Sequence, residues 1–410
     1  MTALSQSCVP QFIAVSEFED AYARLAAWCR ARGYAGHDPF DGLNSRVFQA
    51  APFLRDSRLA RLAWTQGFKR SPVSFRSLAR VPSERNAKGT ALFALAALAR
   101  FRATREAESE EEARELLDDL LAARLKSAGG AAWGYNFDWQ GRAFFAPRGT
   151  PTIVPTAFAA RALIDGGRDL RNEKYLEAAR GACEFILGDL YRSFESEDEV
   201  CFSYTPGDRT RVFNASLLAG EMLAAVGALT GEEELREWSR RAARYVVRRQ
   251  RADGSWAYGA DGYQSWADNF HTAFVLSSLM RIMECAGGDD EFGGALRRGY
   301  EFWRENFFLA SGWPKYYPDR PYPVDTHAAG AAIITMLDMR HIDETAGARA
   351  EQVARWTIRA MQDERGFFYY QRRRLYTVRT PYMRWSQAWM LYALARLLEG
   401  DESEGMRDEG

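Results

Sequence analysis

Gly254-Ser255-Trp256-Ala257-Tyr258 is one of five short segments in which a glycine or small residue and a cluster of aromatic residues precede a new apolar stretch. The spacing from Phe202 to Trp256 is 54 residues, from Trp256 to Trp313 it is 57, and from Trp313 to Phe367 it is 54. One structural unit therefore recurs along the chain, and units of this length predict helical hairpins packed side by side. The other four segments are Gly130–Tyr135, Cys201–Tyr204, Gly312–Tyr317 and Gly366–Tyr370.

Two kinds of helix alternate in this repeat. Stretches rich in alanine, leucine and glycine begin near residues 87, 152, 213, 268, 325 and 382, and more highly charged stretches begin near 110, 172, 232, 290 and 346. Helices that are apolar all round are buried, and amphipathic helices face water. With an N-terminal helix at 17–32 as the sixth outer one, the pattern predicts an all-α fold, an (α/α)6 toroid with aromatic loops at its rim.

The toroid is expected to be one domain over residues 1–400, followed by a disordered acidic tail at 401–410, because the last segment is short and polar. Few strands are expected. The alternation of residues in 367–371 and 375–378 predicts a hairpin at the rim.

The composition restricts the partners and the location of the chain. Lysine and arginine number 54 against 55 acidic residues, so a net charge of -1 gives no global attraction to nucleic acid or to an anionic membrane. The five cysteines include no CxxC pair, so neither a disulfide framework nor a cysteine-based zinc site is predicted. No signal sequence and no run of about 20 apolar residues is evident, so we expect a cytoplasmic protein with no membrane span.

The candidate catalytic residues open two consecutive inner helices. Asp268 and His271 begin the fourth, and Asp325 and His327 begin the fifth. Carboxylate and imidazole groups together can transfer protons near neutral pH. A second interpretation is that both aspartates are helix N-caps and both histidines are structural. No metal-binding spacing such as HExxH is present, and neither a metal nor another cofactor is predicted.

The candidate substrate-binding residues lie in the aromatic loops and in the first turns of the inner helices. Aromatic rings stack on sugar faces, and cations at helix N-termini attract carboxylates. Asn214 is expected to cap the third inner helix, and Asp38 and Asp41 to form a turn. The candidates are Arg85, Lys88, Trp133, Tyr135, Asp138, Tyr204, Trp256, Tyr258, Lys315, Tyr316, Tyr317, Arg384 and Trp385.

Eight segments, covering roughly residues 17–400, resemble in order the motifs of a bacterial exopolysaccharide-biosynthesis protein family. Members of that family are often labelled delta-aminolevulinic acid dehydratase, an enzyme with a TIM-barrel fold, but this chain lacks the alternating strands and helices of that barrel. The resemblance implies a place in a polysaccharide pathway and no particular reaction. The segments are 38–45, 133–139, 150–154, 201–204, 253–256, 268–271, 315–317 and 322–327.

A looser resemblance links 250–256 and 362–368 to the QxxxGxW repeat of squalene and terpenoid cyclases, which are also α/α toroids. The Asp-rich DxDD sequence of those cyclases has no match here, and no cysteine stands near His271 or His327 as in the zinc site of protein prenyltransferases. This resemblance implies shared hairpin architecture.

The leading hypothesis is a carbohydrate-active protein that hydrolyses, eliminates or epimerises an acidic saccharide in a central cleft. A second hypothesis is a noncatalytic glycan-binding or scaffold component of a complex with polysaccharide-synthesis proteins. A third is an isoprenoid-binding or cyclase-like toroid, which requires a deep apolar cavity.

Overall fold

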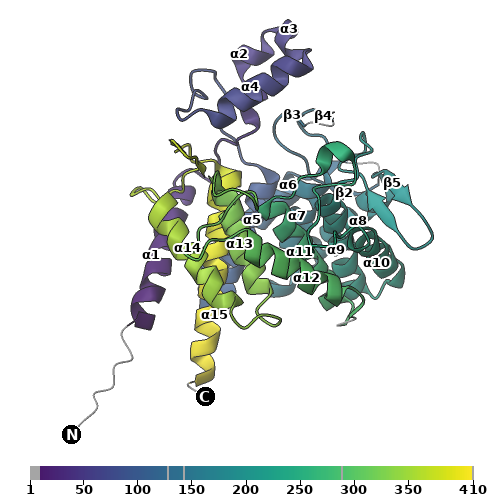
Figure 1. The fold of residues 1–410 in the computed structure, drawn as a ribbon, viewed down its shortest axis with the longest axis vertical. Helices are drawn as coiled ribbons and strands as arrows, with labels where there is room; N and C mark the ends of the chain where they lie inside the picture. The colour runs from purple at the N-terminus through teal and green to yellow at the C-terminus, as the bar shows by residue number, and fades with distance from the viewer. Residues whose placement is uncertain (1–9, 127–128, 142–143, 288–289, 409–410) are drawn as a thin grey trace.

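Six helices form an inner ring in the computed structural model, which describes residues 10–126, 129–141, 144–287 and 290–408 (Figure 1). Each inner helix packs against its neighbours in the series, and the last packs against the first, so the ring closes. The predicted all-α toroid is confirmed. The inner helices are α5 (Ala87–Thr104), α7 (Ile153–Asp169), α9 (Phe213–Thr230), α11 (Asn269–Cys285), α13 (Thr326–Asp338) and α15 (Ala388–Asp408).

Outer helices cover the ring, one against each inner helix. Their first residues lie close to the starts that the charge pattern predicted, apart from the N-terminal helix, which is described from Pro10. They are α1 (Pro10–Arg30), α6 (Ala107–Ala122), α8 (Glu173–Gly188), α10 (Glu233–Val247), α12 (Gly293–Asn306) and α14 (Ala346–Met361).

The inner helices are buried because small and aliphatic residues surround them on all sides. In α5 every residue from Lys88 to Arg100 is buried, and in α9 every residue from Phe213 to Ala224 is buried. Among the described residues, α9 is long and apolar enough to cross a membrane, with a mean hydropathy of 1.3. It is an inner helix of the ring, and 78% of its residues are buried there.

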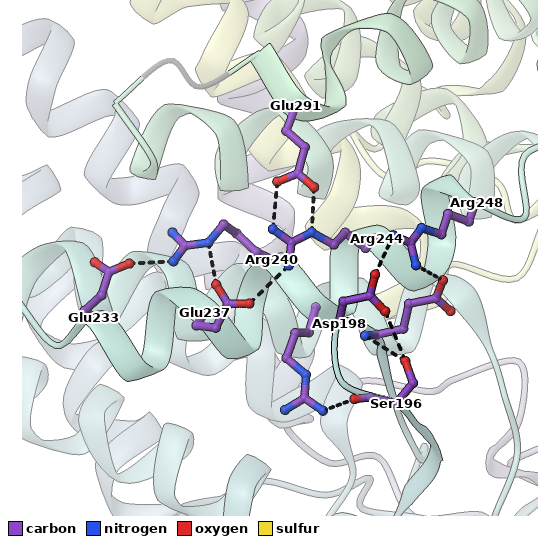
Figure 2. Close-up of polar contacts among 10 residues, drawn as sticks. Ser196, Asp198, Glu233, Glu237, Arg240, Arg244, Arg248 and Glu291 are labelled. Carbon is purple, nitrogen blue, oxygen red and sulfur yellow. Dashed lines mark hydrogen bonds and ion pairs between the residues drawn. The ribbon is translucent and has the colours of Figure 1, made fainter.

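The outer face of α10 carries a network of ion pairs (Figure 2). Glu237 lies 2.8 Å from Arg240 and 3.1 Å from Arg244, and Arg244 lies 2.6 Å from Glu291. Glu237 is 45% exposed, so water screens this network.

The aromatic segments meet at the rim where the inner helices begin. The first N–H of four inner helices donates to the carbonyl oxygen of a tyrosine in the next aromatic segment. A fifth bond runs from Met383, the first residue of the π-helical turn η4 (Met383–Gln387) before α15, to His37. These bonds place all the loops at one end of the ring. The four tyrosine bonds are Ile153 to Tyr204, Phe213 to Tyr258, Asn269 to Tyr316 and Thr326 to Tyr370, at 3.0, 3.1, 3.0 and 3.2 Å.

Nearer the C-terminal ends of the inner helices, ion pairs run around the whole ring. Arg102 of α5 bonds both Asp169 of α7 and Glu399 of α15, at 2.8 and 2.5 Å. The remaining links join α15 to α13, α13 to α11, α11 to α9 and α9 to α7. They are Arg396 to Asp338, Arg281 to Asp338, Arg281 to Glu221 and Arg161 to Glu221. We call these eight residues the ion-pair belt.

The strands are short and antiparallel. The predicted rim hairpin is present as β8 (Gln371–Arg372) and β9 (Thr377–Val378), and β7 (Val324–Asp325) adds a third strand to it. The other pairs are β1 (Leu125–Lys126) with β2 (Ala131–Ala132), β3 (Trp139–Gln140) with β4 (Phe145–Ala146), and β5 (Arg192–Glu195) with β6 (Val200–Phe202).

Residues 41–80, which we call the arm, project from the rim of the ring at one end of the long axis (Figure 1). The arm holds η1 (Asp41–Asn44), α2 (Arg46–Gln49), α3 (Pro52–Arg55) and α4 (Arg58–Arg70). Trp64 of α4 packs on Phe48 and donates a 2.9 Å hydrogen bond to the carbonyl oxygen of Gly42. The buried pair of Arg76 and Asp41, at 2.7 Å, joins the end of the arm to its start.

At the C-terminus, α15 remains helical through Asp408. The predicted disordered tail, 401–410, is therefore helical over 401–408 in the structure, and residues 409 and 410 lie outside the described residues.

Candidate active site

Asp268 and His271 form a hydrogen-bonded pair at the start of α11. Asp268 caps the helix, because Oδ1 accepts the backbone N–H of His271 at 3.0 Å. Its Oδ2 lies 2.7 Å from Nδ1 of His271 and accepts Nε1–H of Trp266 at 3.2 Å. A carboxylate at Nδ1 holds the imidazole with its proton on that nitrogen and leaves Nε2 available for proton transfer. The His271 side chain is 23% exposed, whereas that of Asp268 is 2% exposed.

Asp325 caps α13 in the same way but is fully engaged. Oδ1 accepts the backbone N–H of His327 at 3.0 Å and Nε1–H of Trp385 at 2.8 Å, and Oδ2 accepts Nε2–H of Gln371 at 2.9 Å. Burial raises the pKa of Asp325 to about 6, although the hydrogen bond from Trp385 opposes the shift. Both aspartates are therefore N-caps, as the structural interpretation of the sequence predicted.

His327 lies inside an aromatic cage. Its ring stacks on Phe270 and Trp389, with centroids 4.5 and 4.7 Å away, and meets the edge of Trp385 at 4.3 Å. Neither ring nitrogen has a hydrogen-bond partner among the described residues, and the side chain is buried. Burial, with the nearby positive charge of Lys88, lowers the pKa of His327 well below its ordinary value, so the ring is neutral at physiological pH.

Lys88 is a second buried group with a lowered pKa. Its Nζ lies 4.3 Å from the ring centre of Phe158, 5.0 Å from that of Phe274 and 5.2 Å from that of Trp389. No hydrogen bond from Nζ is found among the described residues. Burial first, and the charge of Arg384 second, lower the pKa of Lys88 well below its usual range.

Arg384 is buried and paired with Asp38. Its Nε and Nη2 donate to the two oxygens of that carboxylate at 2.6 and 2.8 Å. The turn role predicted for Asp38 is also present, because its Oδ1 accepts the backbone N–H of Phe40 at 3.0 Å. Asp38 is thus a site residue, although the sequence favoured a turn for it over a role at the rim. An aspartate before a proline is typical of a turn, and nothing in the local sequence indicated that its partner would be Arg384.

Lys69, at the end of α4, is a neighbour of this region that the sequence did not reveal. Its Nζ lies 4.3 Å from the ring centre of Phe40 and 5.6 Å from that of Trp385. Burial lowers the pKa of Lys69 to about 8, against the attraction of Asp325 and Asp38. No local pattern marks this lysine, because only the packing of the arm against the rim brings it there.

Aromatic contacts link these groups into one central cluster. Phe270 touches both His271 and His327, with ring centres 4.0 and 4.5 Å away. The central cluster comprises Asp38, Lys88, Asp268, His271, Asp325, His327 and Arg384.

Some of the predicted aromatic residues surround the central cluster, and others do not. The Tyr135 and Tyr204 hydroxyl groups are 3.4 Å apart, Tyr258 stacks on Trp266, and Tyr316 meets Tyr317 edge-on. The expectation that Trp133 stacks on a sugar is wrong, because its side chain is fully buried. Trp256 is also buried, but it lines the small pocket beside Asp268 and His271. Their indole N–H groups donate to the carbonyl oxygens of Leu120 and Val246 at 2.8 and 3.0 Å.

Three predicted polar residues bind neighbouring protein groups instead. Arg85 donates to the carbonyl oxygen of Gly33 and pairs with Asp119 on α6. Asp138 accepts the backbone N–H of Arg148 and Nε2–H of Gln49, and Lys315 donates to the carbonyl oxygen of Pro318 in its own loop. The structure does not bring these three side chains to the central cluster.

Asn214 does not cap α9, whose N-cap is Val212. Its Oδ1 has no partner among the described residues, and the residue lines a pocket with Tyr258, Asp268 and His271. That pocket measures only about 10 Å³, which is room for about one water molecule. A second pocket of the same size is lined by Asp38 and Arg384. No group of three or more histidine, cysteine or acidic side chains placed for metal binding occurs in the part of the chain that is described.

Several solved structures with a similar fold are sugar-processing enzymes. The cellobiose 2-epimerase of Bacillus thermoamylovorans matches with a TM-score of 0.61 and 13% identity, over 79% of this chain and 90% of that one. The unsaturated glucuronyl hydrolase of Bacillus sp. GL1 matches with a TM-score of 0.61 and 14% identity, over 93% and 96%. The GH76 α-mannanase of Bacteroides thetaiotaomicron matches with a TM-score of 0.58 and 13% identity, over 77% and 87%. No family model and no curated protein matches the sequence. At these identities the likeness establishes the toroid fold alone.

Proposed function

We propose that the chain is a carbohydrate-processing enzyme that moves a proton on a carbon next to the carbonyl or carboxylate group of an acidic sugar. The Asp268–His271 pair is the observation that carries this proposal. It is a partly exposed imidazole whose Nδ1 is bound to a buried carboxylate, an arrangement that suits a general base. In this proposal His271 is the catalytic residue, and Asp268 is a positioning residue.

The proposed reaction follows from the ability of His271 to accept a proton and to donate it again. Its Nε2 removes a proton from the carbon, and an enolate remains on the sugar. In an epimerisation, a proton returns to the opposite face of that carbon. In an elimination, the neighbouring C–O bond breaks, the departing oxygen takes a proton, and a C=C bond forms. Both routes need no redox partner.

The cations nearby favour an acidic substrate. Nζ of Lys88 lies 5.2 Å from the ring centre of Trp389, and Cζ of Arg384 lies 5.1 Å from that of Trp385. Both rings belong to the cage around His327, and Lys69 approaches from the arm. Developing negative charge on an enolate is stabilised by such groups in a site from which water is largely excluded. Hydrolysis receives less support, because it needs two carboxyl groups that face the glycosidic bond. The carboxylate oxygens of Asp268 and Asp325 accept hydrogen bonds from neighbouring protein groups instead.

The exopolysaccharide resemblance supports a role beside polysaccharide synthesis or modification, and the sugar-processing neighbours support a saccharide substrate. A cytoplasmic location and synthesis proteins as partners belong to this same proposal.

The test uses sugars in deuterated water. The purified protein is incubated with acidic and neutral mono- and oligosaccharides, and mass spectrometry measures deuterium in the sugar, while absorbance reports unsaturated uronates and a colour reaction reports new reducing ends. We expect deuterium in an acidic sugar, and we expect His271→Asn to reduce its incorporation by about 10²–10⁴-fold. His341→Asn is the matched control, since that exposed histidine follows α13 at the opposite end of the ring. Hydrolysis without exchange would refute the proposal.

A second candidate function, noncatalytic glycan binding, is supported by the small size of the pocket beside His271. That pocket has no room for a sugar ring, so a sugar would bind above it. If an acidic oligosaccharide binds in calorimetry, with equal affinity in His271→Asn and without any exchange, the chain is a binding component. The third hypothesis, an isoprenoid site, requires a deep apolar cavity, and the pockets of the central cluster are too small to provide one.

A further inference from the structure

The arm combines positive charge with exposed apolar side chains. Residues 41–80 contain eight arginine and lysine residues but only two acidic ones, Asp41 and Asp56, in a chain whose net charge is -1. Asp41 forms the buried ion pair with Arg76. Five arginines of the arm are exposed: Arg46, Arg55, Arg58, Arg70 and Arg80.

The apolar residues of the arm are exposed to an unusual degree. Phe53 is 75% exposed, Leu59 is 78% exposed and Leu78 is 80% exposed. Val47, Val73 and Phe75 are also exposed. Single exposed apolar residues are common on any protein, but six large ones within one short segment mark an interaction surface.

Arginines and apolar side chains alternate over this surface. Arg46 precedes Val47, Arg55 follows Phe53 after one residue, and Arg58 precedes Leu59. The backbone N–H of Arg46 donates to the carbonyl oxygen of Arg80 at 3.4 Å, so the two ends of the arm lie side by side.

The rim hairpin extends the same pattern. The Tyr376 hydroxyl group donates to the carbonyl oxygen of Arg70 at 3.0 Å, which holds the β8–β9 turn against the end of α4. In that turn Leu375 is 90% exposed and follows the exposed Arg374.

We propose that the arm docks the protein on an anionic lipid bilayer. The arm projects beyond the ring (Figure 1), so its exposed side chains can reach a flat surface. A bilayer accepts separate protruding apolar side chains into its interface while its anionic head groups pair with the arginines between them. A protein partner requires one contiguous complementary patch, and a soluble polyanion gains nothing from leucine and phenylalanine.

The test is cosedimentation of the full chain with vesicles of phosphatidylcholine alone or mixed with phosphatidylglycerol. We expect binding to the mixed vesicles only, and weaker binding as salt rises. Each arginine contributes roughly fivefold to such binding, so Arg46→Gln with Arg70→Gln should weaken it by about 25-fold. Phe53→Ser with Leu59→Ser should weaken it by at least about tenfold.

Two control variants carry the same kinds of substitution, leucine to serine and arginine to glutamine, at exposed positions outside the arm. Leu229→Ser, at the C-terminal end of α9, and Arg297→Gln, on α12, should bind the mixed vesicles like the unchanged protein. Thermal unfolding of each variant shows that the ring is intact. Turnover of a soluble sugar should not change in the arm variants, which separates this proposal from the proposed function.

Three results would overturn the proposal. One is the absence of binding to phosphatidylglycerol vesicles, and another is equal binding by the arm and control variants. The third is binding to heparin as tight as binding to the vesicles, lost in Arg46→Gln with Arg70→Gln but retained in Phe53→Ser with Leu59→Ser, which would indicate a surface for polyanions in general.

Discussion

The ion-pair belt and two residues of the central cluster, Lys88 and His327, lie on the same ring of inner helices but differ in whether a buried charged or titratable group has an acidic partner. In the belt every arginine faces a carboxylate on a neighbouring helix, and Glu221 serves both Arg161 and Arg281. In the central cluster Lys88 and His327 have aromatic neighbours and no acidic partner within hydrogen-bond distance among the described residues.

The difference separates a structural role from a functional one. A buried ion pair is costly to break, because removal of one partner leaves the other charged and unsolvated. A buried lysine or histidine without a partner lowers the stability of the folded protein. Groups of this kind, with shifted pKa values, are common at functional sites. The belt therefore holds the ring closed, and the central cluster is where the chemistry is expected.

The largest effect is expected in the belt. Glu221→Ala leaves Arg161 and Arg281 without their shared carboxylate, and it should lower the free energy of unfolding by about 3–5 kcal/mol. Urea-induced unfolding followed by circular dichroism measures this loss. A change below about 1 kcal/mol would contradict the structural role of the belt.

Asp325 should give the next largest effect, and this one depends on pH. Its pKa is 3.8 in the unfolded chain and about 6 in the folded one, so the folded protein binds a proton more tightly between these values. The free energy of unfolding therefore falls as pH rises through this window, by up to about 3 kcal/mol. Asp325→Asn removes this fall, so the stability of the variant relative to the unchanged protein should increase from pH 4 to pH 6. Urea unfolding of both proteins across this range checks the prediction, and parallel curves would refute it.

Lys88→Met is expected to change the free energy of unfolding in the direction opposite to a substitution in the belt. A methionine matches the length of the lysine without its buried amine, so it should raise the free energy of unfolding by about 1–3 kcal/mol. The same change should abolish any turnover found with an acidic sugar. Arg102→Met, in the belt at the other end of α5, is the matched variant and should lower stability. Stabilisation by both changes would erase the distinction between the two regions.

The smallest effect is expected on the outer face of α10 (Figure 2). Glu237 bridges two arginines, as Glu221 does, but it is 45% exposed. Glu237→Ala should therefore cost no more than about 1 kcal/mol, and salt should reduce even that. Urea unfolding at low and high salt compares it with Glu221→Ala, and equal losses would mean that burial does not set the strength of these networks.

The alternation of inner and outer helices could be predicted from the sequence because it is a local property. The inner starts near 87, 152, 213, 268, 325 and 382 lie within one residue of those of α5, α7, α9, α11, α13 and η4. Hydrophobic periodicity reports which face of a helix is buried without reference to distant residues. For the same reason the rim hairpin and the two aspartate caps were predictable.

Where each site residue lies in the fold could not be predicted from the local sequence. Trp133 and Trp256 belong to the same repeated motif as Tyr135 and Tyr258, yet the tryptophans fill the space between helices while the tyrosines lie at the rim. A motif specifies which residue types occur together. It does not specify which of them faces the ring axis, because that depends on how each hairpin packs on the next.

By itself the sequence determined a ring of six helical hairpins with its aromatic loops and Asp–His pairs at the inner helix starts. Only the tertiary structure decided that Asp38 pairs with Arg384, 346 residues away, and that Lys69 folds back over the rim. It alone placed eight charged residues in a closed belt. Helix propensity and burial patterns act over a few residues, whereas these contacts join distant parts of the chain and form only when the hairpins pack on one another.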